Sequence, residues 1–169
     1  PPESTLATSS TASGGSATSA ITLLAVASFA SQSMVRVSDS LLPQISTDMG
    51  VSVGAASIVV TAYAFAHGSV QLVIGPVGDR FGKYACIIAA CAAASVLVLL
   101  CGLATSLPML VAARLACGLA AGWIIPLAFA FLGDVIPYER RQQVLGTFLS
   151  GQILGQLFGQ AAGGVLGDL

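Results

Sequence analysis

Long hydrophobic segments separated by short polar links dominate the sequence. Four windows contain no Asp, Glu, Lys or Arg, namely residues 49–78, 84–113, 115–133 and 142–167. A further apolar run near the N-terminus carries only Arg36 and Asp39 as charges. Each window holds the roughly 20 residues with which a helix crosses a bilayer. The pattern therefore predicts five membrane-spanning helices, at about residues 20–45, 54–77, 84–104, 107–132 and 144–167.

The composition places these helices in a membrane rather than in a soluble core. Hydrophobic residues make up 56% of the 169 residues and charged residues only 8%, whereas a soluble domain has about 25% charged residues. The sequence predicts an all-α, multi-pass integral membrane protein in contact with the lipid bilayer. The formal net charge of −1 excludes the basic surface that nucleic-acid binding requires.

The short links between the spans predict the orientation. Arg80 and Lys83 lie between the second and third spans, and Arg140 and Arg141 lie between the fourth and fifth. The other two links contain no Lys or Arg. Because basic links stay on the cytoplasmic side, we expect a cytoplasmic N-terminus, in a membrane of the bacterial inner-membrane type.

The two ends of the sequence differ from the hydrophobic body. We expect residues 1–19, rich in Ser, Thr, Ala and Pro, to be a disordered cytoplasmic tail, because they show no apolar periodicity. Residues 20–169 form the transmembrane bundle. The sequence lacks an initiating Met and stops directly after the fifth span. We therefore expect a piece of a longer protein, whose missing C-terminal helices are its partner.

The link "GPVGDRFGK", residues 75–83, gathers glycines and charges between two apolar spans. Glycine permits a tight turn and a close approach of helices. Asp79 suits the start of the next helix, where a carboxylate accepts from free amide groups. One interpretation is a loop that fixes orientation and caps a helix. The residues concerned are Gly75, Gly78, Asp79, Arg80, Gly82 and Lys83.

The order of these residues also resembles the loop between helices two and three of the major facilitator superfamily of secondary transporters. That resemblance implies a conformational latch. In it, Asp79 engages a helix end in the other half of the transporter. Arg80 pairs with an acid at the cytoplasmic end of helix four, a position that Asp134 occupies here.

The fourth span contains a second similarity to this family. Arg114, Gly118 and Gly122 stand as in its helix-four motif, and the resemblance implies that Arg114 takes part in proton coupling. The alternative is that this permanent cation extends along the helix to the membrane interface.

The fifth span carries a glycine pattern similar to that of the proton-driven antiporters of the family. It differs at Gln160, where the pattern has proline. Gly151, Gly155, Gly159 and Gly163 also repeat every four residues, which predicts a smooth face for close packing of another helix. The positions that match or depart from the pattern are Gly146, Gly155, Gly159, Gln160, Gly163 and Gly164.

Polar residues recur at helical spacing on three spans. Such side chains lack hydrogen-bond partners in lipid, so we expect them to face the bundle interior, either as contacts between helices or as the lining of a substrate cavity. The predicted cavity residues are Gln32, Tyr63, Gln71, Gln152 and Gln156. His67 shares the face of Tyr63 and is either a hydrogen-bonded interior residue or a proton carrier.

Asp39 is an acid well inside the first predicted span. The segment Asp39 to Pro43 resembles the end of helix one in drug–proton antiporters of the family. The resemblance implies that Asp39 carries the proton, with Arg36 or Arg114 as a nearby cation. The alternative is a structural Asp39–Arg36 pair.

Taken over residues 20–169, the resemblance implies the N-terminal bundle of a major facilitator fold, about five of twelve helices. The implied function is proton-coupled efflux of drugs or small metabolites by alternating access, with a small-molecule substrate and protons as partners. No motif indicates an enzyme, a cofactor or a metal site. The alternative function is a small membrane protein for interaction or assembly, with its glycine faces as docking surfaces.

Overall fold

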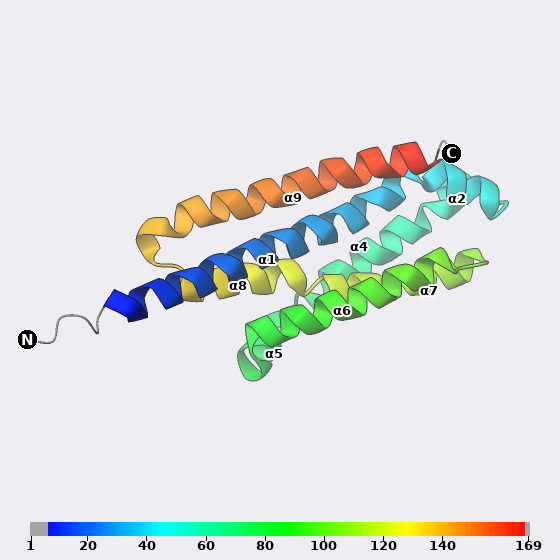
Figure 1. Cartoon of the computed structure of the whole chain (residues 1–169). Coiled ribbons are helices and arrows are strands. Elements are labelled where there is room, and N and C mark those ends of the chain that lie inside the picture. The colour runs from blue at the N-terminus through cyan, green and yellow to red at the C-terminus, as the bar shows by residue number, and fades with distance from the viewer. Residues whose placement is uncertain (1–6, 168–169) are drawn as a thin grey trace, which may run out of the picture.

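The computed structural model describes residues 7–167, with side chains described from Ser19 onward. Within these residues the structure is entirely helical (Figure 1), which confirms the predicted fold class. In chain order the helices are α1 (Ala7–Ser40), α2 (Leu42–Asp48), α3 (Val53–Ala56), α4 (Ile58–Val70), α5 (Ile74–Phe81), α6 (Lys83–Gly102), α7 (Leu107–Ala121), α8 (Ile124–Val135) and α9 (Tyr138–Gly167).

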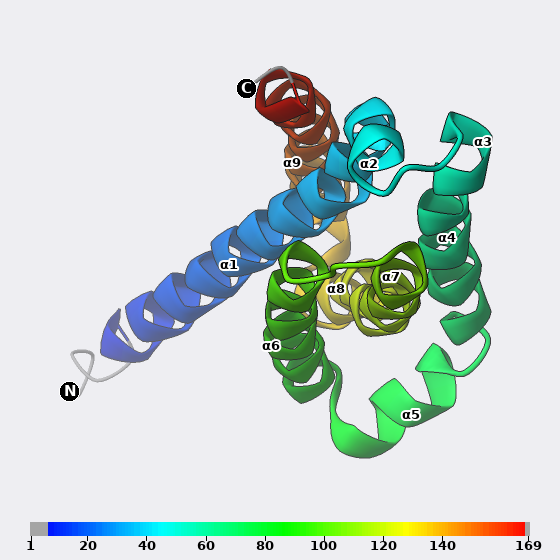
Figure 2. The ribbon, with the colours of Figure 1, turned by 90° about the vertical axis from the view of Figure 1, so that its right-hand side faces the viewer.

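The long helices lie roughly along one direction and form a bundle (Figure 1). Seen from the end, α7 and α8 lie centrally, with α4, α5 and α6 around one side and α1 and α9 on the other (Figure 2). The α5 turn and the α8–α9 link lie at the same end as the beginning of α1. The α6–α7 link and the end of α9 lie at the opposite end.

Several predicted spans are interrupted, and three of the interruptions lie close to a proline. The span predicted at 54–77 is divided into α3, α4 and α5, and the span at 107–132 into α7 and α8. Proline has no amide hydrogen, and its ring clashes with the carbonyl four residues earlier. Pro43, Pro76 and Pro126 therefore explain the breaks after α1, α4 and α7.

Four stretches among the described residues are long and apolar enough to cross a membrane: Ser19–Ser40, Val53–Val70, Lys83–Gly102 and Leu107–Val135. The fifth predicted span, 144–167, lies within α9, which does not reach the same hydrophobicity. Glu139, Arg140 and Arg141 lie in the first turn of that helix, and Gln152, Gln156 and Gln160 interrupt its apolar part. α9 thus combines the length of a span with a polar face.

The N-terminal region differs from the prediction of a disordered tail over residues 1–19. α1 begins at Ala7, so residues 7–19 are helical, whereas residues 1–6 lie outside the described part. An existing helix extends at little cost, because each added residue gains a hydrogen bond without a new nucleation step. The alanines between Ala7 and Ala20 have high helix propensity.

Glycines position two helix pairs at close range. On α9, a Cβ atom at Gly155 would overlap Phe29 O of α1, and one at Gly159 would overlap Ser33 O. On α7, a Cβ at Gly118 would overlap Tyr63 O of α4. The smooth glycine face predicted for the fifth span is therefore confirmed, and its partner is α1.

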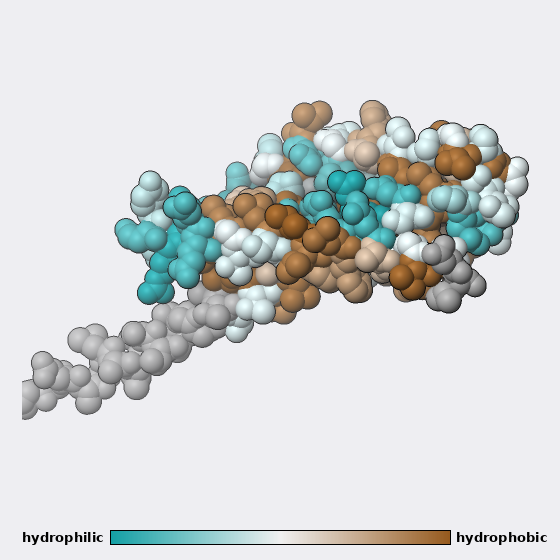
Figure 3. All heavy atoms as spheres, turned by 90° about the horizontal axis from the view of Figure 1, so that it is seen from above, coloured by the Kyte–Doolittle hydropathy of each residue, from teal (hydrophilic) through white to brown (hydrophobic). Residues whose placement is uncertain are grey.

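Large apolar side chains cover much of the outside of the bundle. Phe65, Leu72 and Leu99 are among the most exposed of them. Figure 3 shows a cluster of hydrophilic residues at one end of this face and, over the rest of it, many hydrophobic residues with hydrophilic ones among them. This distribution suits a bundle whose surface contacts lipid and whose end contacts water.

Candidate functional site

Asp39 and Arg36 form an ion pair near the end of α1. Arg36 Nη1 donates to Asp39 Oδ2 at 3.0 Å, and both side chains are partly buried. The second oxygen, Oδ1, is buried and has no hydrogen-bond partner among the residues that the structure describes. Of the two cations predicted to lie near Asp39, the structure places Arg36 against it. The Asp39–Arg36 pair that the sequence offered as an alternative is therefore present in the structure.

Arg114 on α7 is buried, with only 3% of its surface exposed. Its Nη1 donates to Met34 O of α1 at 3.4 Å, and its guanidinium lies 4.6 Å from the centre of the Tyr63 ring. Nε and Nη2 have no hydrogen-bond partner in the described part of the chain. The interpretation in which Arg114 extends to the membrane interface is wrong, because the side chain points into the bundle instead.

Tyr63 and His67 of α4 stack one turn apart, with ring centroids 5.6 Å apart and planes inclined by 27°. Tyr63 is buried and His67 half-buried. Nδ1 of His67 and the hydroxyl of Tyr63 are buried without hydrogen-bond partners among the described residues. Tyr63 thus links His67 to Arg114. Gln71, predicted on the same face, is exposed instead.

The glutamines of α9 separate by position. Gln152 is buried and accepts from Gln32 Nε2 of α1 at 3.4 Å. Gln156 is half-buried, and Gln160 is exposed. Ser40 Oγ donates to Gln160 O at 3.0 Å. The four-residue spacing of these glutamines predicts that all three face the interior, which is correct for Gln152 and wrong for the exposed Gln160.

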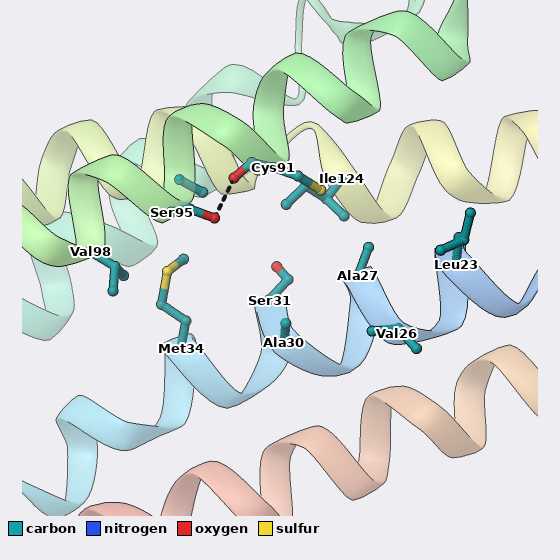
Figure 4. A pocket seen from close by; sticks show the side chains of 11 residues that line it. Leu23, Val26, Ala27, Ala30, Ser31, Met34, Cys91, Ser95, Val98 and Ile124 are labelled. Atoms are coloured by element: carbon teal, nitrogen blue, oxygen red, sulfur yellow. Dashed lines mark hydrogen bonds between the residues drawn. The ribbon is translucent and has the colours of Figure 1, made fainter.

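Two cavities in the bundle are mainly apolar. The first, of about 360 Å³, lies between α1, α6 and α8 (Figure 4). Ser31 points toward it with a hydroxyl that has no hydrogen-bond partner, and Ser95 Oγ donates to Cys91 O at 2.9 Å. The second, of about 440 Å³, is lined by parts of α1, α2, α4, α6, α7 and α9 and includes Arg114.

The residues of the polar cavity predicted from the sequence lie apart from the two apolar cavities just described. None of the five lines either of them, whereas Gln71 lines a separate pocket with Asp79 and Lys83. Gln32 and Gln152 bind each other, and Tyr63 packs beneath Arg114. The helical spacing identified the polar faces, but the partners of those faces depend on how the helices pack.

At the end of the bundle opposite Asp39, Lys83 forms the ion pairs of the charged link, residues 75–83. Its Nζ forms an ion pair with Asp134 Oδ2 at the end of α8 and lies 3.6 Å from Asp79 Oδ1. Arg80 instead lies over the Phe81 ring, 5.6 Å from its centre. The predicted Arg80–Asp134 pair is therefore wrong in this structure. Lys83, three residues further on, begins α6 and faces α8.

Two glycines of this link have a visible structural reason. Gly82 ends α5 with a φ of +88°, a value that residues with a Cβ rarely adopt. A Cβ at Gly78 would lie 2.5 Å from Leu127 Cδ2 of α8. A Cβ at Gly75 would meet nothing within 4 Å, so packing against its neighbours does not require glycine at this position.

The comparison with known proteins decides the family. The sequence profile of the Major Facilitator Superfamily matches residues 21–169. The chain belongs to the major facilitator superfamily. This confirms the family expected from the three motifs, and it makes the chain part of a transporter fold rather than an enzyme.

Individual members of the superfamily show the same relationship. The chain is 32% identical over 126 residues to the uncharacterized MFS-type transporter Rv1250 of Mycobacterium tuberculosis, covering 75% of this chain and 22% of the relative. It is 32% identical over 143 residues to the uncharacterized MFS-type transporter YwfA of Bacillus subtilis, and the match covers 83% of this chain and 34% of the relative. It is 28% identical over 132 residues to the multidrug export protein EmrB of Haemophilus influenzae, and the match covers 78% of this chain and 26% of the relative. The chain thus spans about a third or less of each relative's length.

The structure of this superfamily member also contains contacts that the sequence did not predict. Ser33 Oγ donates to Gly155 O of α9 at 2.9 Å, and Arg141 Nη2 donates to Gly133 O at the end of α8 at 2.8 Å. Cys101 Sγ and Cys117 Sγ lie 3.7 Å apart on α6 and α7. The contact of Ser33 with α9 could have been predicted, because Ala25, Phe29 and Ser33 repeat every four residues along α1, as the glycines of α9 do.

Proposed function

We propose that the chain is part of a proton-coupled secondary transporter that exports drugs or other small metabolites by alternating access. The observation that carries the proposal is the Asp39–Arg36 pair on α1, with one carboxylate oxygen left without a partner. Ionisable groups within membrane helices are costly and are functional candidates for that reason. The relative EmrB is a multidrug export protein, which supports export as the direction.

Protonation of Asp39 would change the contacts of α1 in a defined way. The neutral acid loses its ionic attraction to Arg36, while the 3.0 Å contact is strongest with a charged carboxylate. The next residue, Ser40, contacts α9 through its hydrogen bond to Gln160 O. A change at Asp39 therefore acts beside the interface between α1 and α9. This interface is the element that we propose responds to proton binding.

The charged link at the other end supports a two-state transporter. The Lys83–Asp134 pair joins the beginning of α6 to the end of α8, and Asp79 lies beside it with an exposed side chain. In our proposal this cluster stabilises one conformation, and the exposed carboxylate of Asp79 exchanges its contact with Lys83 for another part of the transporter in the other conformation. Alternating access then moves one helical bundle against another about a site between them. The cytoplasmic side is the one that bears Arg80, Lys83, Arg140 and Arg141.

The test is drug export driven by a pH gradient in proteoliposomes that contain the whole protein. Asp39→Asn keeps the size of the side chain but carries no titratable group, so we expect export to lose its dependence on the gradient. Asp48→Asn is the matched control, because Asp48 is exposed and accepts only from Gln44. Gradient-driven export by Asp39→Asn at the wild-type rate would rule out Asp39 as the proton carrier.

A further inference from the structure

The cavity around Arg114 combines an apolar wall with one buried cation. Its volume is about 440 Å³, within the range of small-molecule sites. Met34, Val37, Val98, Leu110 and Phe158 contribute apolar side chains from four helices. Arg114 is the charged residue among those that line it. Such a space favours a ligand whose body is apolar and whose charge is confined to one group.

The unpaired donors of Arg114 form a specific recognition edge. Nη1 is directed to Met34 O, whereas Nε and Nη2 have no partner. Nε–H and the adjacent Nη2–H point the same way from the planar guanidinium. Together they match the two oxygens of a carboxylate in a bidentate contact. The edge of Arg114 without a partner among the described residues is thus the edge that recognises carboxylates best, and because both nitrogens are buried, a carboxylate reaches them when the guanidinium turns toward the cavity.

No acid among the described residues neutralises this cation. The ion pairs in that part of the chain join Arg36 to Asp39 and Lys83 to Asp79 and Asp134. The Tyr63 ring contributes a cation–π contact, which is weaker than a full counter-charge. A buried charge without a partner is costly. A ligand that brings one negative charge would remove much of that cost.

We propose that this cavity binds a lipophilic organic carboxylate, with the carboxylate on the Nε–Nη2 edge of Arg114 and the apolar body against α1, α6 and α9. This names the substrate class of the transporter and so rests on the proposed transport function. A cationic ligand is disfavoured by repulsion from Arg114. A neutral amide of the same shape offers one acceptor oxygen and no negative charge, so it leaves one donor and the buried charge of Arg114 uncompensated, which costs binding free energy.

The test uses three probes that share one apolar body and differ in charge: 2-naphthoate, 2-naphthamide and 2-naphthylmethylammonium. Equilibrium binding is measured on the purified whole protein in detergent, without a proton gradient. We expect naphthoate to bind at least about tenfold more tightly than the amide, and the cation to bind weakest, because the charged pair is buried. Equal binding of acid and amide, or preference for the cation, overturns the inference.

Variants locate the site. Arg114→Met should remove the preference for naphthoate over the amide, whereas Arg114→Lys, which keeps the charge but not the fork, should retain part of it. If these variants do not fold, Leu110→Trp fills this cavity and not the other one without changing Arg114, and it should weaken binding of both naphthoate and the amide. Met109→Trp is the matched control, because Met109 is exposed and does not line the cavity. Unchanged naphthoate binding in Leu110→Trp would place the site elsewhere.

Failure of this inference is separable from failure of the proposed function. The binding preference depends on Arg114 and is measured at a single pH. Proton coupling depends on Asp39 and is measured as gradient-driven transport. Loss of the anion preference with intact Asp39-dependent transport would refute only the substrate class.

Discussion

At the residue scale, two arginines in membrane helices have opposite environments. Arg36 is paired with an acid one turn away and remains partly exposed, whereas Arg114 is buried against an aromatic ring and has no acid partner among the described residues. The first arrangement neutralises charge within one helix. The second holds α1, α4 and α7 together through a single guanidinium, which contacts Met34 O and the Tyr63 ring.

The contact between Tyr63 and Arg114 gives a prediction about stability. Tyr63→Phe keeps the ring and removes a hydroxyl that has no hydrogen-bond partner, so we expect little change in the free energy of unfolding. A double-mutant cycle of Tyr63→Leu with Arg114→Met should show a coupling of about 0.5–2 kcal/mol. The measurement is reversible unfolding in mixed micelles. A coupling indistinguishable from zero would contradict a stabilising cation–π contact.

Sequence spacing predicted some of these residue contacts and missed others. Arg36 and Asp39 are three residues apart on one helix, so their pairing follows from helical geometry alone. The partner of Asp134 did not follow, because Arg80 and Lys83 both lie in the same link. The positive φ of Gly82 ends α5 between them, and Lys83 begins a new helix that faces α8. The sequence does not specify which of the two cations this turn directs toward Asp134.

At the element scale, glycine contacts set the distance between helices. Three glycines of α9 lie directly against the α1 backbone, at Phe29, Ser33 and Val37. α7 uses Gly118 and Gly122 in the same way against α4. Small residues let helix backbones approach closely in membranes, where helix association relies on packing and hydrogen bonds rather than on the hydrophobic effect.

A matched pair of alanine substitutions tests this packing. Gly155→Ala places a Cβ against Phe29 O, whereas Gly164→Ala, on the same helix, meets nothing within 4 Å. We expect Gly155→Ala to destabilise the protein by about 1–3 kcal/mol, as overpacking does. Gly164→Ala should be neutral or slightly stabilising, because alanine favours helix. The comparison of thermal midpoints in detergent checks both, and equal midpoints would contradict the α1–α9 packing.

The helices themselves were more predictable than their interruptions. Charge-free windows identified the second to fifth spans, and an apolar run with two charges identified the first, because transfer of apolar side chains to lipid depends on composition. The breaks near Gln71 and Gly122 lie within charge-free windows, so the positions of the charged residues could not reveal them. Their signal was Pro76 and Pro126, which the helix can accommodate either as a kink or as an end. Packing against neighbouring helices decides between the two.

At the scale of the whole molecule, the charged links lie at one end of the bundle. The Lys83–Asp134 pair joins two of them, and the α8–α9 link follows directly (Figure 1). The α6–α7 link lies at the opposite end and carries no charged residue. Together with the positive-inside rule, this arrangement supports a cytoplasmic position for the charged end.

Thiol labelling in intact cells tests that orientation. Thr105 lies in the α6–α7 link, and Tyr138 lies beside the α8–α9 link; both are exposed. We expect a membrane-impermeant maleimide to label Thr105→Cys from outside, and to label Tyr138→Cys only after the membrane is permeabilised. The unsubstituted protein, whose four cysteines lie in helices, measures the background. The opposite labelling pattern would reverse the orientation.

The central claim is that export of substrate is exchanged for a proton carried by Asp39. It is tested most directly by adding an exported drug to the purified whole protein in weakly buffered detergent solution and recording the change in pH. The account predicts proton release on drug binding by the wild type and none by Asp39→Asn, with both proteins still binding the drug. Equal proton release from the two proteins, or drug binding by the wild type without any release over the pH range of transport, would contradict it.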